Sequence, residues 1–125
     1  MKHIFISGAI SNDPEYFEHF SKAQEELIEL GFKPVNPALV TKPLVDLECE
    51  FTYEQWMDIA FNLLKQCDGI YHLDHWWESK GSTREHCFAK AYQMPILYQS
   101  SFEFYRELQR DGVDVYQEAL KEVDS

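Results

Sequence analysis

Apolar positions along the chain fall into two alternating patterns, short continuous runs and longer stretches at helical spacing. The short runs, which are typical of buried strands, cover residues 3–7, 32–35, 68–73 and 94–98. Helical spacing or a helix-start signal marks the stretches between and after them. This alternation predicts one α/β domain over residues 1–125, a three-layer, doubly wound parallel sheet of about four to five strands of the flavodoxin or Rossmann-like type.

Local signals set the expected helix ends. We expect the first helix to begin at Asn12 or Asp13, with Pro14 in its first turn, and to stop at Gly31. Residues 38–51 show no clear periodicity and are expected to cross the ligand face as an irregular excursion. Thr52 with Gln55 forms a capping box that opens the next helix. Terminal helices are expected over residues 102–109 and 115–123.

Two loops rich in small residues are expected at the same edge of the sheet. Residues 8–11 follow the first strand, and residues 79–85 follow the third. In open parallel sheets, ligands bind outside the carboxyl ends of the strands, where the strand order reverses. The convergence of these loops predicts a site there, and Gly8 would permit close approach of a ligand.

The stretch from Ser79 to His86 leads into a helix that opens with small residues. A helix N-terminus offers free N–H groups and positive dipole to an anion, and Glu85 would lie beside it. The same residues also fit a plain capping box, because Glu85 follows Ser82 by three positions. The two interpretations are compatible, and both stay open.

Composition narrows the function classes. A formal net charge of −11 argues against a nucleic-acid polymer as partner, because such binding depends on basic side chains. No signal peptide or membrane-length apolar run is present, so we expect a cytoplasmic protein with no membrane partner. The GxGxxG and Walker A patterns are absent, so no cofactor is expected. His72, Asp74 and His75 lack a third matched ligand, and no metal is expected either.

Several segments resemble the nucleoside 2-deoxyribosyltransferase superfamily, which includes the 2'-deoxynucleoside 5'-monophosphate N-glycosidases, and most closely its branch of small bacterial and phage proteins. The segments that carry the resemblance are FISGAI, VNP, YEQWM, LLKQCDGIYHL, WWESKGSTREH and AKAY, in order over about residues 3–98. The resemblance implies a doubly wound sheet, a homodimer or higher homo-oligomer, and a nucleoside or nucleotide substrate. In its SxGxxxE pattern, Ser79 and Gly81 would hold a 5'-phosphate, and Glu85 would attack C1' of the sugar.

Two positions depart from the superfamily pattern. The usual tyrosine that orients the glutamate falls on Phe5, which we place among the substrate-binding residues, and the usual aspartate that assists the leaving base falls on Ala60. Asp58 is the nearest carboxylate, but two residues along a helix turn it toward the opposite face. Loss of the hydroxyl and of the acid would each slow the reaction on the order of a hundredfold or more.

The leading hypothesis is therefore an N-glycosidase or deoxyribosyltransferase-like protein that acts on a (deoxy)nucleoside or its 5'-monophosphate. Glu85 would be the nucleophile. Gly8 and Ile10 would line the sugar, Trp76 or a neighbour would cover the base, and Phe5 is also counted among the substrate-binding residues. The phosphate would be held by Ser79, Gly81, Ser82 and the amides of Ser82 and Thr83. Phe5 and Ala60 keep a second hypothesis open, a catalytically silent nucleotide-binding module. A purely structural or partner-binding oligomer is a third.

Overall fold

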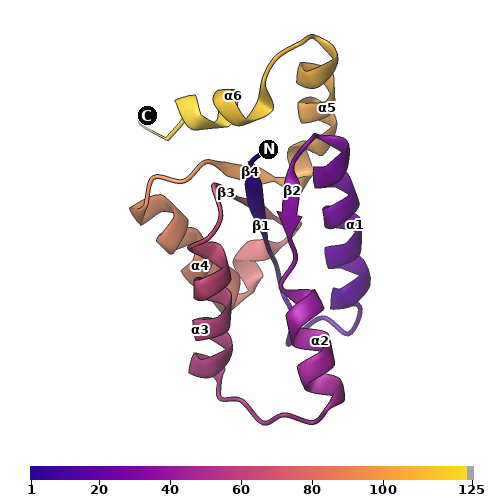
Figure 1. Cartoon of the computed structure of the whole chain (residues 1–125), viewed down its shortest axis with the longest axis vertical. Helices are drawn as coiled ribbons and strands as arrows, with labels where there is room; N and C mark the ends of the chain where they lie inside the picture. Colours follow the sequence, from indigo (N-terminus) through magenta and orange to yellow (C-terminus); the bar gives the residue numbers. More distant parts are fainter. Residues whose placement is uncertain (124–125) are drawn as a thin grey trace.

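A four-stranded, all-parallel sheet forms the centre of the molecule in the computed structural model, which describes residues 1–123 (Figure 1). The strand order is β2-β1-β3-β4. The strands are β1 (His3–Ser7), β2 (Lys33–Val35), β3 (Gly69–His72) and β4 (Ile96–Tyr98). Six α-helices flank this sheet within the described residues, so the predicted α/β fold with a parallel sheet is confirmed.

Two apolar clusters, one on each face of the sheet, make the fold three-layered. Alternate residues of β1 point to opposite faces, so Ile4 and Ile6 belong to one cluster and Phe5 to the other. The first cluster packs against α1 (Tyr16–Glu29), α5 (Phe102–Arg110) and α6 (Val115–Lys121), and the second against α3 (Tyr53–Leu64) and α4 (Lys80–Ala91). Figure 1 shows α3 and α4 on one side of the strands and α1 on the other.

The strand order reverses beside β1. The chain leaves β1 through α1 to reach β2 on one side, and later places β3 on the other side of β1. In register, Ser7 of β1 lies opposite His72 of β3, so the two strands end together. Their carboxyl ends therefore form the crevice in which doubly wound sheets bind ligands.

The first helix begins later than predicted. Asp13 accepts the backbone N–H of Glu15 at 2.9 Å, which holds Pro14 in a turn ahead of the helix, and α1 starts at Tyr16. The predicted stop is confirmed, because Gly31 follows the helix with a φ of +86°, a conformation that favours glycine.

The predicted irregular excursion over residues 38–51 is partly wrong, because Ala38–Asp46 form the helix α2. Asn36 begins it by accepting the N–H of Ala38 at 2.9 Å. The helix was missed because apolar side chains such as Leu39 and Val45 stay half exposed, at 52% and 50%. Its apolar residues are thus not confined to one buried face, and no helical period results.

The capping box that opens α3 is confirmed. Thr52 Oγ1 accepts the N–H of Gln55 at 3.1 Å, and Gln55 Oε1 accepts the N–H of Thr52 at 2.8 Å. Within residues 1–123, no helix combines the length and the apolar composition needed to cross a bilayer.

Candidate functional site

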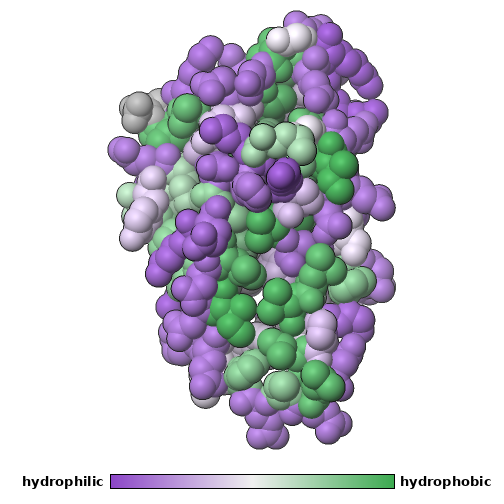
Figure 2. Space-filling model, viewed as in Figure 1, coloured by the Kyte–Doolittle hydropathy of each residue, from purple (hydrophilic) through white to green (hydrophobic). Residues whose placement is uncertain are grey.

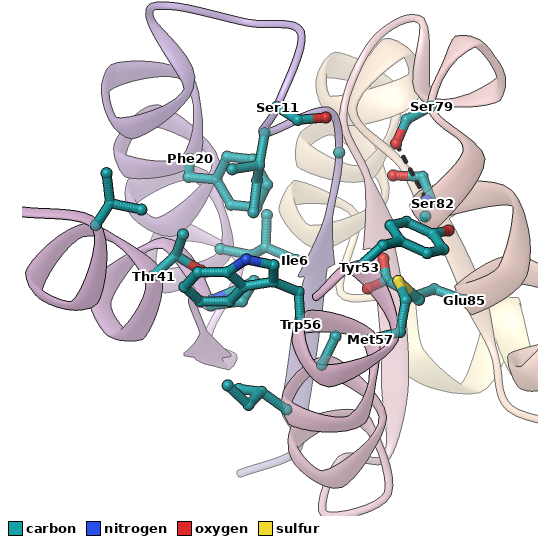
Figure 3. A pocket seen from close by; sticks show the side chains of 17 residues that line it. Ile6, Ser11, Phe20, Thr41, Tyr53, Trp56, Met57, Ser79, Ser82 and Glu85 are labelled. Atoms are coloured by element: carbon teal, nitrogen blue, oxygen red, sulfur yellow. Dashed lines mark hydrogen bonds between the residues drawn. The ribbon is translucent and has the colours of Figure 1, made fainter. Parts of the chain in front are cut away.

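A cavity of about 250 Å³ lies at the carboxyl end of β1, between α2, α3 and the beginning of α4 (Figure 3). Most of its wall is apolar, with a few hydroxyls and one carboxylate. The lining residues that the sequence predicted for the site are Gly8, Ile10, Ser79, Gly81, Ser82 and Glu85. The two loops of small residues therefore meet at one cavity, as their topology predicts.

The capping box predicted from Ser82 and Glu85 is wrong, because α4 begins one turn earlier. Ser79 is the N-cap, and its Oγ accepts the N–H of Ser82 at 3.2 Å. Its carbonyl accepts the N–H of Thr83 at 3.0 Å. The amides predicted to hold a phosphate, those of Ser82 and Thr83, are thus occupied, and the first-turn amides without a helical partner belong to Lys80 and Gly81.

Ser82 is released from capping and faces the cavity. Its side chain is 1% exposed, and its Oγ has no hydrogen-bond partner among the described residues. Buried hydroxyls are normally paired, so an unpaired one in a cavity wall favours a ligand that supplies the missing partner.

Glu85 is the carboxylate of the cavity. It is 7% exposed, and Ser7 Oγ donates a hydrogen bond of 2.6 Å to its Oε1. Burial raises the pKa of Glu85 to about 7, and the bond from Ser7 opposes part of that rise. Near neutral pH the group therefore exists in both forms, and its ionised form has one oxygen held by Ser7.

Gly8 is required for packing as well as for the cavity. A Cβ at this position would lie 2.5 Å from Cδ1 and 2.8 Å from Cγ of Leu73. No side chain fits at that distance without a shift of Leu73. The glycine thus lets β1 and the loop after β3 approach each other, which sets the floor of the crevice.

Phe5 does not line the cavity, contrary to its predicted role. It is fully buried and packs with Leu64, Ile70 and Ala89 in the cluster beneath α3 and α4. Ser7, two residues further along the same face of β1, supplies instead the hydroxyl that contacts Glu85.

Trp76 also lies outside the cavity, so its predicted place over a base has no support from the cavity lining. Its ring stacks on His72 at 4.1 Å and on His86 at 4.5 Å between centroids. These two histidines hydrogen-bond to each other at 3.0 Å. The rings that line the cavity come mainly from α3, where Trp56 extends toward Thr41 and Tyr53 lies near the start of α4 (Figure 3).

Ser7, Trp56 and Tyr53 were missed as site residues. Ser7 ends an apolar run that predicts only a buried strand. Tyr53 is the first residue of α3 and Trp56 directly precedes the buried Met57, so neither ring stands out from the core pattern of that helix. The capping box at Thr52 was the available signal, since it fixes the phase of α3 and thereby the direction of both rings.

Residues 2–98 match a family described as a domain of unknown function, DUF4406. The chain belongs to the DUF4406 family. No curated protein matches it significantly. Every lining residue of the cavity lies within the matched range, whereas α5 and α6 follow it. The cavity therefore belongs to the part of this DUF4406 protein that matches the family.

Ala60, the position at which the resemblance implies an aspartate in other proteins, faces the cavity. Ala60 is part of its lining, and the exposed Asp58 is not. Within residues 1–123, the cavity lining contains a single carboxylate, that of Glu85.

Replacement of Glu85 with Gln should stabilise the protein at alkaline pH. A carboxyl whose pKa rises from 4.5 unfolded to about 7 folded weakens the fold as pH increases between those values, by about 1.4 kcal/mol per pH unit. We expect Glu85→Gln to gain on the order of 3 kcal/mol relative to the wild type between pH 5 and pH 8, measured by urea unfolding.

Glu54→Gln is the matched control, because that side chain is 68% exposed. Its effect should stay within about 0.5 kcal/mol at both pH values. A Glu85→Gln variant that is less stable than the wild type at pH 8 would show that the carboxylate serves the fold.

Replacement of Ser7 with Ala should raise the pKa of Glu85 above 7, because the hydrogen bond favours the ionised form. A bond to a charged group contributes about 1.5–3 kcal/mol, so the midpoint should move up by about one pH unit or more. The side-chain carboxyl ¹³C shift of Glu85 measures it directly. Ser82→Ala, an equally buried serine of the same cavity, should leave the midpoint in place; the same shift in both variants would contradict a specific role for Ser7.

Proposed function

We propose that this DUF4406 protein is an N-glycosidase or deoxyribosyltransferase-like enzyme that cleaves or transfers the N-glycosidic bond of a (deoxy)nucleoside or its 5'-monophosphate. The observation that carries the proposal is Glu85, a carboxylate buried in a ligand-sized cavity beside the N-terminus of α4. Burying a carboxylate weakens the fold, and such a group is typical of sites that use its chemistry.

Glu85 is suited to nucleophilic catalysis at a sugar carbon. Ser7 holds Oε1, which leaves Oε2 to attack C1' of the sugar as the base departs through a transition state of oxocarbenium character. Water, or the base of an acceptor, then cleaves the resulting ester. Because the hydrogen bond fixes the carboxylate plane, the attacking oxygen needs little reorganisation.

The beginning of α4 supports an anionic group on the substrate. The free amides of Lys80 and Gly81 and the unpaired hydroxyl of Ser82 lie at one end of the helix dipole. One cation lies beside this end, since Lys80 is the first residue of α4 and its Nζ lies 5.1 Å from the ring centre of Tyr53, whereas the Arg84 guanidinium is paired with Glu54 at 2.9 Å. In a chain of net charge −11, this local arrangement favours a 5'-phosphate.

A homo-oligomer remains part of the proposal. Apolar side chains stay exposed on α2 and just after it, among them Leu39, Val45 and Leu47, at 52%, 50% and 75%. Figure 2 shows apolar surface on the lower half of the molecule, where Figure 1 places α2 and α3. Val45 also lines the cavity, so a second copy packed here would lie beside the site.

The second candidate is a silent nucleotide-binding module. The observation that favours it is the cavity wall itself, which within the described residues offers no carboxylate besides Glu85 to protonate a leaving base.

Base release separates the two candidates. Purified protein would be incubated with each deoxynucleoside and each 5'-monophosphate, and free base measured by chromatography. We expect release by the wild type, and a loss on the order of a thousandfold or more in Glu85→Gln, because within residues 1–123 the cavity lining holds no other carboxylate to act as nucleophile.

Asp58→Asn is the control on the neighbouring helix, and it should release base at the wild-type rate. Glu85→Gln turning over as fast as the wild type would reject the assignment of the nucleophile. Saturable stabilisation by a nucleotide without any base release would establish the binding module instead.

A further inference from the structure

The cavity gives a leaving base no proton donor of suitable strength. Besides Glu85, its side-chain N–H and O–H groups within the described residues are hydroxyls, a phenol and an indole, from Ser11, Thr41, Ser79, Ser82, Tyr53 and Trp56. Such groups hold their protons too tightly at neutral pH to act as strong general acids. Glu85 cannot fill this role, because the same carboxylate must be ionised to attack C1'.

A neutral base that leaves without a proton departs as an anion, which is slow. A base that already carries a positive charge needs no proton, because it departs as a neutral molecule. We propose, resting on the proposed function, that the substrate class is the 5'-monophosphate N-glycoside of a cationic base, such as a pyridinium or an N7-alkylated purine.

The reaction balances without a general acid. Oε2 of Glu85 forms a bond to C1', the C1'–N bond breaks, and its electron pair neutralises the ring nitrogen of the base. Water then attacks C1' and the ester bond breaks, which returns the carboxylate of Glu85. The proton of that water passes to solvent, so each turnover releases one proton.

The two ends of the cavity match the two charges of such a substrate. Lys80 and the N-terminus of α4 favour the phosphate at one end. Trp56 extends from α3 to the other side, toward Thr41 (Figure 3). The face of a tryptophan ring attracts a cation, so Trp56 is placed to bind a cationic base. Tyr53 already has Lys80 and Arg84 near its ring, which leaves Trp56 for this role.

Ala60 is the position that makes the site selective. It lines the cavity on the same helix as Trp56, one turn further along. A carboxyl there would reach the space where the base departs, and alanine leaves that space without an acid.

The decisive experiment compares two substrates that differ by one N7 methyl group and the positive charge that it gives the base. 7-Methylguanosine 5'-monophosphate carries a cationic base, and guanosine 5'-monophosphate a neutral one; both would be tested in the ribose and the 2'-deoxyribose form, with nicotinamide mononucleotide as a pyridinium. Free base and released protons are measured together, and uncatalysed rates are subtracted. We expect kcat/KM to be at least about a hundredfold higher for the methylated member of a pair, which is the usual contribution of a general acid.

The variant Ala60→Asp tests the cause of that preference. It should raise kcat/KM for the neutral guanylate about tenfold or more and narrow the ratio between the pair, whereas Asp58→Asn should leave both rates as in the wild type. An equal gain on both members, or no gain on the neutral one, would overturn the role assigned to Ala60.

The outcomes separate the two levels of the proposal. Release of base from deoxyguanylate but not from its methylated form, or equal rates on both, would overturn the cationic substrate class and leave the glycosidase intact. No release from any nucleotide would overturn both. Release from the methylated or pyridinium substrates that persists in Glu85→Gln would reject the nucleophile.

Discussion

The hydrogen bond between Ser7 and Glu85 joins the end of β1 to α4. At 2.6 Å between a strand end and α4, it fixes a carboxylate in a position that burial disfavours. Two effects of opposite sign act on that group. Removal from water raises its pKa, the hydroxyl lowers it, and the outcome near 7 keeps an ionised fraction available at neutral pH. Glu85 shares the cavity lining with Ser79, Gly81 and Ser82 at the beginning of α4.

The fold places these groups by topology. The reversal of strand order brings the ends of β1 and β3 together. Gly8 permits this close approach, because any side chain there would collide with Leu73. Ser79 caps α4 one turn before the serine that local sequence favours, which releases the Ser82 side chain from capping. β1 and α4 thus meet at one carboxylate, and the cavity lining holds no second acid within the described residues.

Topology and motif spacing together predicted much of this site. Gly8, Ile10, Ser79, Gly81, Ser82 and Glu85 line the cavity as expected, because the carboxyl ends of neighbouring parallel strands bring the loops that follow them to the same edge of the sheet. The directions of side chains outside regular helices and strands could not be predicted from the sequence. Trp76 follows His75, whose φ of +62° turns the chain and sends the indole onto the histidines of β3 and α4. A turn of this kind has no periodicity from which its direction follows.

Ser7 shows a different limit. A serine at the end of an apolar run is ordinary, and its importance depends on a helix 78 positions later. The resemblance to the deoxyribosyltransferase superfamily therefore implies the loss of an orienting hydroxyl at Phe5, while the structure shows a hydroxyl donated from the next position on that face. The same face that buries Phe5 presents Ser7 to Glu85, and only the packing of α4 on β1 makes this visible.

Trapping of the covalent intermediate would test the role of Glu85 most directly. A 2-fluoroarabinosyl analogue of 7-methylguanosine 5'-monophosphate should form the sugar ester quickly and hydrolyse it slowly, because fluorine destabilises both transition states while the cationic base leaves readily. Intact mass measurement followed by peptide mapping should show one fluoroarabinosyl phosphate on Glu85. Turnover of the natural substrate with no adduct from the analogue, or an adduct on another residue, would contradict the account.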